Sequence, residues 1–258
     1  ADEVGKQITG SYHIPESDSD FPLSLVSESI GQCAAMSSMK AVDFRFRPVA
    51  GIAGAVDFLG TVKPGDTLEL EATLVKADEE AVGYDGVARV NGEPVVQLHD
   101  CLGPMVPMED FDDPVAVSAR YDLLKGGGAE PDAFTGVDEF DFELEELDPG
   151  TSATGSFQIP EAAAFFGDHC PRNPVFPGTL LMNLNLRFVQ KLAETLDGGL
   201  WKAKGMKNVK LRAFMPPGES LSLSAEVEEI EGDKATILVQ SRRGKRVNSG
   251  ARVLLEKT

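Results

Sequence analysis

Apolar and polar side chains alternate along many segments of this chain, and the segments fall into two similar sets. Apolar residues at every second position are typical of strands that bury one face. The pattern predicts strands at residues 51–61, 66–77, 81–90 and 94–105, and again at residues 204–214, 220–230, 235–241 and 246–256. Each set follows an apolar stretch of helical length, at residues 23–39 and 178–196. The order of elements is therefore the same in both halves.

An internal sequence repeat supports the same division. The segment TGSYHIPE at residues 9–16 returns as TGSFQIPE at residues 154–161, and each copy is expected to form a short strand. The segment PGDTLEL at residues 64–70 returns as PGESLSL at residues 217–223, a turn followed by a strand. Repeats of this kind indicate two copies of one structural unit.

Each unit is expected to pack one helix against an antiparallel sheet, which makes the chain an α+β protein. The helix at residues 23–39 is apolar around most of its circumference, as a helix enclosed by a sheet should be. Asn91-Gly92 and Arg243-Gly244 lie between the last two predicted strands of each unit. Tight turns at these places favour residues that tolerate positive φ.

The predicted domain organisation has three parts. Residues 1–106 form the first unit and residues 137–258 form the second. Residues 107–136 are rich in Asp, Pro and Gly, and we interpret them as an acidic linker.

The two predicted units differ at their beginnings. Phe140, Phe142, Leu144 and Leu147 alternate with acidic residues and predict a first strand of the second unit, which has no counterpart before Thr9. The chain also begins with Ala rather than Met. Excision from a longer protein and removal of an initiator Met both agree with that start.

Composition narrows the classes of function. The net charge of −18 argues against electrostatic binding to nucleic acid or to an anionic membrane, since both need Lys and Arg. The chain has no apolar run that approaches the roughly 20 residues needed to insert across a bilayer, and its first residues do not resemble a secretory signal. Cys33, Cys101 and Cys170 lack the short spacing of metal ligands and are an odd number, so a disulfide framework is not indicated. We expect a cytoplasmic protein.

The two copies differ most in the loop before the helix. Residues 161–175 separate Pro160 from Phe176 in the second copy, whereas only residues 16–20 occupy this place in the first. The longer loop contains His169 and several prolines, and it leads into a helix that begins at Gly178. A histidine held beside the free amides of a helix N-terminus combines a general base with an oxyanion site.

The stretch FGDHCPRNPVFPGTL at residues 166–180 resembles the active-site motif of the FabA/FabZ-type 3-hydroxyacyl-carrier-protein dehydratases. That resemblance implies the hot-dog fold, here as a double hot dog in which two units form a pseudo-dimer. It also implies active sites between units, with an acid that falls seven residues after the Phe of Phe-Pro-Gly. This position is Asn183 in the second copy and Glu28 in the first, counted from Phe21.

The resemblance therefore implies one working site, built from His169 and Gly178 of the second unit and Glu28 of the first. His169 would remove the C2 proton of a 3-hydroxyacyl thioester, the Gly178 N–H would polarise the thioester carbonyl, and Glu28 would protonate the departing hydroxyl. The product would be a trans-2-enoyl thioester. We expect Glu28 and His169 to lie about 3 to 7 Å apart in one tunnel. Asn183 should mark a second tunnel without histidine.

The resemblance covers most of the chain. In its overall pattern the chain is similar to the tandem dehydratase domains of polyunsaturated-fatty-acid and polyketide-type synthases. The segments that carry this likeness are 28–33 (ESIGQC), 84–85 (YD), 90–92 (VNG) and 100–101 (DC). No metal or redox cofactor is implied, because the phosphopantetheine arm belongs to the substrate carrier. Asp168 and Cys170 flank the histidine and depart from the family's usual pattern, which leaves the substrate's acyl chain open.

Two other functions remain open at this stage. A hot-dog acyl thioesterase uses the same fold and a carboxylate on the same helix. A non-catalytic module that binds an acyl chain or a carrier protein would be favoured if Glu28 did not face His169. The remaining histidines, His13 and His99, fall on predicted strands and are interpreted as structural. A nucleophilic role for Cys170 is disfavoured.

The expected partner is an acyl carrier protein, held near the site by basic residues or tethered in the same polypeptide. Arg172 and Arg187 are the basic residues expected nearest the site. A second group, here called the basic cluster, consists of Lys202, Lys204, Lys207, Lys210 and Arg212. The pseudo-dimer leaves further dimerisation open.

Overall fold

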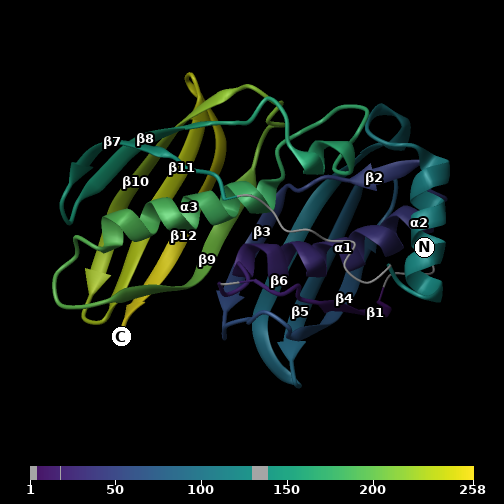
Figure 1. The fold of residues 1–258 in the computed structure, drawn as a ribbon, viewed down its shortest axis with the longest axis horizontal. Coiled ribbons are helices and arrows are strands. Elements are labelled where there is room, and N and C mark those ends of the chain that lie inside the picture. Colours follow the sequence, from purple (N-terminus) through teal and green to yellow (C-terminus); the bar gives the residue numbers. More distant parts are fainter. Residues whose placement is uncertain (1–4, 18, 130–138) are drawn as a thin grey trace.

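The computed structural model describes residues 5–17, 19–129 and 139–258. Two long helices organise it: α1 (Leu23–Ala41) in the first unit and α3 (Gly178–Ala193) in the second. Both begin at the predicted residue, directly after a Phe-Pro pair. Figure 1 shows α1 lying across the strands of the first unit and α3 across those of the second.

The strands form one continuous antiparallel sheet. Those of the first unit are β1 (Gln7–His13), β2 (Phe46–Pro48), β3 (Ile52–Phe58), β4 (Thr67–Ala77), β5 (Ala81–Val90) and β6 (Glu93–Pro107). Those of the second are β7 (Glu143–Asp148), β8 (Ser152–Gln158), β9 (Trp201–Leu211), β10 (Ser220–Glu231), β11 (Lys234–Arg243) and β12 (Arg246–Lys257). The order is β1-β4-β5-β6-β3-β9-β12-β11-β10-β8-β7, and β2 pairs with β6.

The predicted strands are present in both units, with small differences at their ends. β3 ends at Phe58 and β9 ends at Leu211, a few residues before the predicted limits. The turn Asn91-Gly92 has positive φ at both residues, as predicted. In the second unit Gly244 has positive φ, whereas Arg243 is the last residue of β11.

The two units join through β3 and β9, which pair in antiparallel register from Ile52 opposite Lys210 to Asp57 opposite Gly205. This pairing continues the sheet from one unit into the other, and the two helices contact each other. The helix α1 is enclosed as its sequence predicts. In α1, Val26, Ile30 and Ala34 are fully buried. The double hot-dog architecture expected from the sequence is therefore present.

The segment interpreted as an acidic linker contains a helix that its composition did not predict. A short 3-10 turn, η1 (Met108–Asp110), precedes α2 (Pro114–Gly126). Asp113 caps α2, because its carboxylate accepts hydrogen bonds from the first free backbone amides, and Pro114 suits the first helical position. Val117 anchors α2 on the first unit by packing with Phe44 and its neighbours. The predicted boundary at residues 136 and 137 lies outside the described residues.

None of the helices within the described ranges is long and apolar enough to cross a membrane.

Candidate active site

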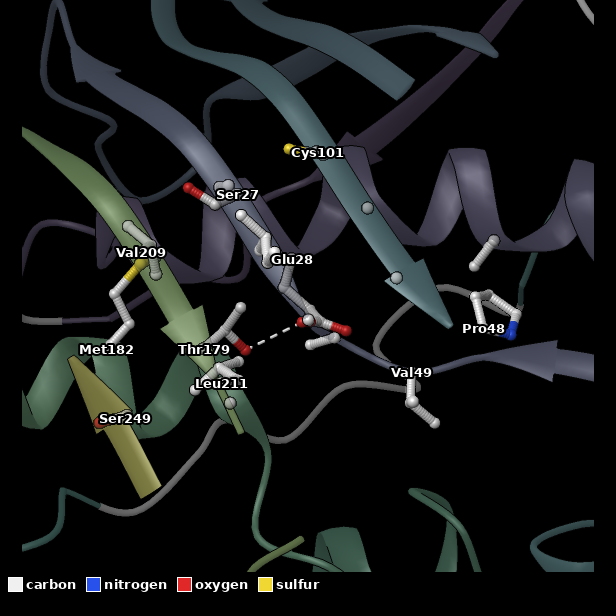
Figure 2. Close-up of a pocket in the computed structure, with 18 of the residues that line it drawn as sticks. Ser27, Glu28, Pro48, Val49, Cys101, Thr179, Met182, Val209, Leu211 and Ser249 are labelled. Carbon is white, nitrogen blue, oxygen red and sulfur yellow. Dashed lines mark hydrogen bonds between the residues drawn. The ribbon is translucent and has the colours of Figure 1, made fainter. Parts of the chain in front are cut away.

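A cavity of about 230 Å³ lies between the two units. The helix α1 contributes Ser27, Glu28, Gly31, Gln32, Ala35 and Met39 to its wall, and α3 contributes Gly178, Thr179, Met182 and Asn185. The loop before α3 adds His169 and Cys170. Figure 2 shows Glu28 reaching from α1 toward Thr179 of α3. The cavity therefore brings together the three residues that the sequence singled out, from both units.

The loop that carries His169 is held by its backbone and by the linker segment. It begins with a 3-10 turn, η2 (Ala164–Gly167), and the His169 backbone N–H donates to the carbonyl of Phe165 at 2.6 Å. Arg172 donates to the Asp113 carboxylate at 2.9 Å and to the backbone carbonyl of Glu109 at 3.0 Å. The linker thus fastens the loop to the start of α2.

The environment of His169 favours its neutral form. Burial lowers the pKa of His169 below its ordinary value, and the charge of Arg47 lowers it further, while the carboxylates of Glu28 and Asp168 act in the opposite direction. A neutral imidazole near physiological pH can accept a proton, so His169 has the protonation state of a general base. The adjacent thiol is less reactive, because burial raises the pKa of Cys170.

The Glu28 carboxylate is fixed by hydrogen bonds from both helices. Gln32, one turn further along α1, donates to one oxygen at 2.6 Å, and the Thr179 hydroxyl donates to the other at 2.9 Å. Each carboxylate oxygen can accept more than one hydrogen bond, so both remain able to meet a substrate group. The acid is positioned by the second unit although it belongs to the first.

Gly178 is the first residue of α3 and must be small. A Cβ at this position would collide with the Leu211 side chain and would also approach Ala50. Pro177 precedes it, and no side chain caps the helix there. The first amides of a helix have no partner within the helix, so those of α3 are free to bind a carbonyl oxygen that gains negative charge.

A second, smaller cavity of about 50 Å³ lies on the other side of α3. Asn183 lines it together with Pro22 and Leu25 of the first unit, and no histidine lies among its described lining residues. This is the arrangement expected of Asn183. Arg187, however, also lines this cavity and donates to the backbone carbonyl of Phe140 at 3.0 Å. The prediction that Arg187 lies near the His169 site is therefore wrong.

Arg47 and Thr179 are among the lining residues that sequence reasoning missed. Arg47 lies in the short strand β2, has only 14% of its side chain exposed and pairs with Asp112 at 3.4 Å. Thr179 follows Gly178 and reaches Glu28, but no spacing in the sequence connects the two helices. His13 and His99 do not line the cavity; they contact Thr67 and Asp57.

Comparisons with protein families and with sequence relatives match part of this chain, whereas comparisons with solved structures match nearly all of it. Residues 145–251 match the ApeI-like family, described as ApeI dehydratase. The matched range contains His169 and Gly178 but not Glu28. The chain is 29% identical over 111 residues to a 3-hydroxyacyl-(acyl-carrier-protein) dehydratase FabZ of Levilactobacillus brevis. The aligned residues cover 42% of this chain and 75% of that protein. It is 33% identical over 94 residues to a FabZ of Clostridium botulinum. Here the aligned residues cover 35% of this chain and 65% of that protein.

Solved structures match along the whole chain. A protein assigned as an oleoyl thioesterase of Lactobacillus plantarum has a TM-score of 0.64 at 10% identity, over 98% of this chain and 97% of its own. A MaoC-like dehydratase has a TM-score of 0.57 at 12% identity, over 99% of this chain and 98% of its own. Likeness at this level of identity establishes the fold, here the double hot dog.

Proposed function

We propose that this protein dehydrates 3-hydroxyacyl thioesters to trans-2-enoyl thioesters. One observation carries the proposal: a cavity between the units is lined by a histidine whose pKa is lowered, a helix N-terminus and a carboxyl group. These groups have the roles that elimination of water next to a thioester requires, namely a base, an oxyanion site and an acid. The likeness of residues 145–251 to a dehydratase family supports the same reaction.

The proposed reaction moves two protons and releases one water. His169 takes the C2 proton as the thioester carbonyl gains negative charge, and the Gly178 N–H donates a hydrogen bond to that oxygen. The electron pair left at C2 forms the double bond to C3 as the C3–O bond breaks. Glu28, in its protonated form, gives its proton to the departing hydroxyl. Proton return from His169 to Glu28 through water then restores both residues.

Thr179 and Arg47 have supporting roles in this scheme. The Thr179 hydroxyl orients the carboxyl group of Glu28. Arg47 lowers the pKa of His169 and so favours the neutral base. Thr179 belongs to the sequence motif, whereas Arg47 reaches the cavity from β2, which the motif does not include.

The proposed substrate is carried on the phosphopantetheine arm of an acyl carrier protein. The cavity wall is mostly apolar, with Met182, Val209 and Leu211 among its side chains, which suits an acyl chain. The FabZ relatives are named as dehydratases of acyl-carrier-protein substrates, which supports the same kind of carrier here. Arg172, the basic cluster and the tethering expected for such a carrier stay part of this proposal, whereas Arg187 does not.

The test is to incubate the purified protein with crotonyl pantetheine and to follow two signals at once. Loss of the enoyl absorbance reports hydration, the reverse of the proposed reaction, while a thiol reagent reports hydrolysis. We expect hydration without thiol release. His169→Ala and Glu28→Gln should each lower the rate by roughly 100-fold or more, since each removes a proton-transfer group. His13→Ala is the matched control and should keep the wild-type rate.

Two outcomes separate the candidate functions, and a third tests the residue assignments. Thiol release without hydration would replace the proposal with a thioesterase, the activity for which several proteins with whole-chain fold likeness are named. Binding of acyl pantetheine with neither reaction would indicate a binding module. Near-normal hydration by either active-site variant would refute the assignment of that residue.

A further inference from the structure

The interiors of the two units can be compared position by position, because they share one irregularity. In the first unit Ala88 pairs with Val96 while Arg89 pairs with Pro94, which leaves Val95 as the extra residue of a β-bulge. In the second unit Ser241 pairs with Ser249 while Arg242 pairs with Val247, which leaves Asn248 as the extra residue. The bulges define equivalent positions.

The same comparison extends to the helices. Ile30 is the ninth residue after Phe21, and Asn185 is the ninth after Phe176. Four equivalent pairs follow from the helices and bulges, each apolar in the first unit and polar in the second: Ile30 and Asn185, Ala88 and Ser241, Val95 and Asn248, Val96 and Ser249. All eight side chains are buried. The second unit therefore has a polar group of residues where its counterpart has a hydrocarbon core.

These four residues, here called the polar patch, are only partly satisfied by one another. The Asn185 amide donates to the Ser249 hydroxyl at 3.4 Å, and the Ser249 and Ser241 hydroxyls are 2.7 Å apart. The Asn185 side-chain oxygen has no hydrogen-bond partner within the described part of the chain, and neither has either polar atom of the Asn248 side chain. Buried polar groups are nearly always paired, so these atoms point to a missing partner.

Two residues of the polar patch face the active-site cavity, whereas Ser241 and Asn248 lie behind them and are not among its lining residues. Asn185 and Ser249 line the same cavity as Glu28 and His169. On α3, Thr179 and Asn185 both face this cavity and are six residues apart, which is about 9 Å along a helix. Figure 2 shows Ser249 on β12, on the side of the cavity away from Glu28, with Leu211 between them in this view. Asn185 thus lies further along α3 than Thr179, the residue that holds Glu28, and an acyl chain that extends along the cavity from the thioester would reach it.

We infer that the polar patch binds a hydroxyl group on the acyl chain, several carbons beyond the 3-hydroxyl that the reaction removes. The inference rests on the proposed function for the position of the thioester. A hydroxyl donates one hydrogen bond and accepts others, so it can satisfy the Asn185 oxygen and also accept from a serine hydroxyl. A carbonyl could not satisfy that oxygen. Around the patch the lining residues are Met182, Met206, Gly250 and Ala251, none of which carries a charge, so a neutral group fits.

The substrate class that follows is an acyl chain already oxygenated along its length, rather than a plain alkyl chain. Such a chain comes from earlier cycles of condensation and ketoreduction in which a hydroxyl was left in place. The enzyme would then have to distinguish two hydroxyls, removing the one beside the thioester and holding the distant one. Their separation along the cavity provides that distinction.

The test uses probes that cannot react. S-(2-oxoalkyl) pantetheine thioethers have a methylene between sulfur and carbonyl, so they cannot be hydrolysed, and without a hydroxyl at C3 they have no water to eliminate. A series of equal chain length, with one hydroxyl at successive carbons beyond C3, is compared with the plain alkyl probe by titration calorimetry. We expect one hydroxyl position to improve binding by roughly tenfold, about the effect of one or two net hydrogen bonds.

The variants take their replacements from the first unit. Asn185→Ile and Ser249→Val should each reduce the hydroxyl preference to about one, because they recreate the apolar positions Ile30 and Val96. Met182→Leu changes an apolar lining residue and is the control, since it should alter the affinity for both probes equally. The preference in the wild-type protein is informative even if a variant does not fold.

The possible results separate this inference from the proposed function. A wild-type protein with no preference at any hydroxyl position overturns the inference, whatever its turnover. If Asn185→Ile and Ser249→Val bind both probes more tightly than the wild-type protein does, the patch is filled by water alone. That result would also overturn the inference. A clear hydroxyl preference in a protein that dehydrates no thioester would support the patch and refute the proposed reaction.

Discussion

The hydroxyl of Thr179 donates a 2.9 Å hydrogen bond to the carboxylate of Glu28, joining two residues that are 151 positions apart in the chain. Glu28 lies on the helix of the first unit, and Thr179 lies on the first turn of the helix of the second. The geometry of the acid therefore depends on how the two units pair. A covalent pseudo-dimer keeps that pairing intact at any protein concentration.

Thr179→Val should lower kcat by about tenfold with little change in KM, because it removes the hydrogen bond that orients Glu28 while its shape is nearly kept. Thr179→Ser retains the hydroxyl and should recover most of the rate. Steady-state kinetics on a 3-hydroxyacyl pantetheine would measure both. An equal loss in the two variants would show that packing, not the hydrogen bond, is what matters.

The acid side of the pH profile should respond to Asp168. The carboxylate of Asp168 raises the pKa of His169, so Asp168→Asn should lower that pKa further. A general base acts in its neutral form, and the acidic limb of kcat/KM reports its pKa in the free enzyme. The limb should therefore move to lower pH, with the rate at pH 8 unchanged. Asp141→Asn, at an exposed acid on the second cavity's side, is the control and should leave the limb in place.

Gly178→Ala should disturb the oxyanion site. The new methyl group would collide with the end of the Leu211 side chain, so either that side chain or the start of α3 must shift, and a small shift of α3 at the reacting atoms costs roughly tenfold to a hundredfold in kcat/KM. Overpacking of this kind also costs about 1–3 kcal/mol in the free energy of unfolding. Gly167→Ala is the matched control, because nothing lies within 4 Å of a Cβ added there. Adding Leu211→Ala to Gly178→Ala should restore part of the rate; no restoration would argue against the steric explanation.

The sequence predicted the fold well because the repeat is strong at the places where elements begin. The Phe-Pro pair before each helix set both helix starts, and alternation of apolar residues located the long strands. The linker helix was missed because the Asp, Pro and Gly content of residues 107–136 favours irregular structure. The overall composition thus hid a local signal, because Asp113 followed by Pro114 is typical of the start of a helix.

The site was less predictable, since it depends on contacts between units. Arg47 lies on a strand of three residues, too short to show any periodicity, and its place in the cavity follows from the pairing of β2 with β6. The error about Arg187 had a visible cause. Arg187 is four residues after Asn183, so both lie on one face of α3, the face of the second cavity.

The last prediction concerns delivery of the substrate by a carrier protein. Acyl carrier proteins are typically acidic, and this chain has 42 acidic and 24 basic residues, so the two proteins should repel each other at long range. Local attraction must then come from exposed basic side chains near the cavity. Arg172 is already engaged with Asp113 and Glu109, and its substitution would also loosen α2. Arg212 of the basic cluster is the sharper choice, because it is exposed and lies between Leu211 and Ala213, which line the cavity.

We expect a free carrier to bind weakly and in a salt-dependent way, and Arg212→Glu to weaken binding several-fold at low salt and less at high salt, where such charges are screened. Lys234→Glu, at the first residue of β11 and not among the cavity's lining residues, makes the same change in net charge and is the control. A carrier fused through a short flexible linker should overcome the repulsion, since it is present at an effective concentration on the order of millimolar. Fusion should therefore raise turnover well above that with an equimolar free carrier. If the free carrier binds tightly, and neither salt nor Arg212→Glu changes its affinity, charge does not govern delivery. The electrostatic reason for a tether would then be gone.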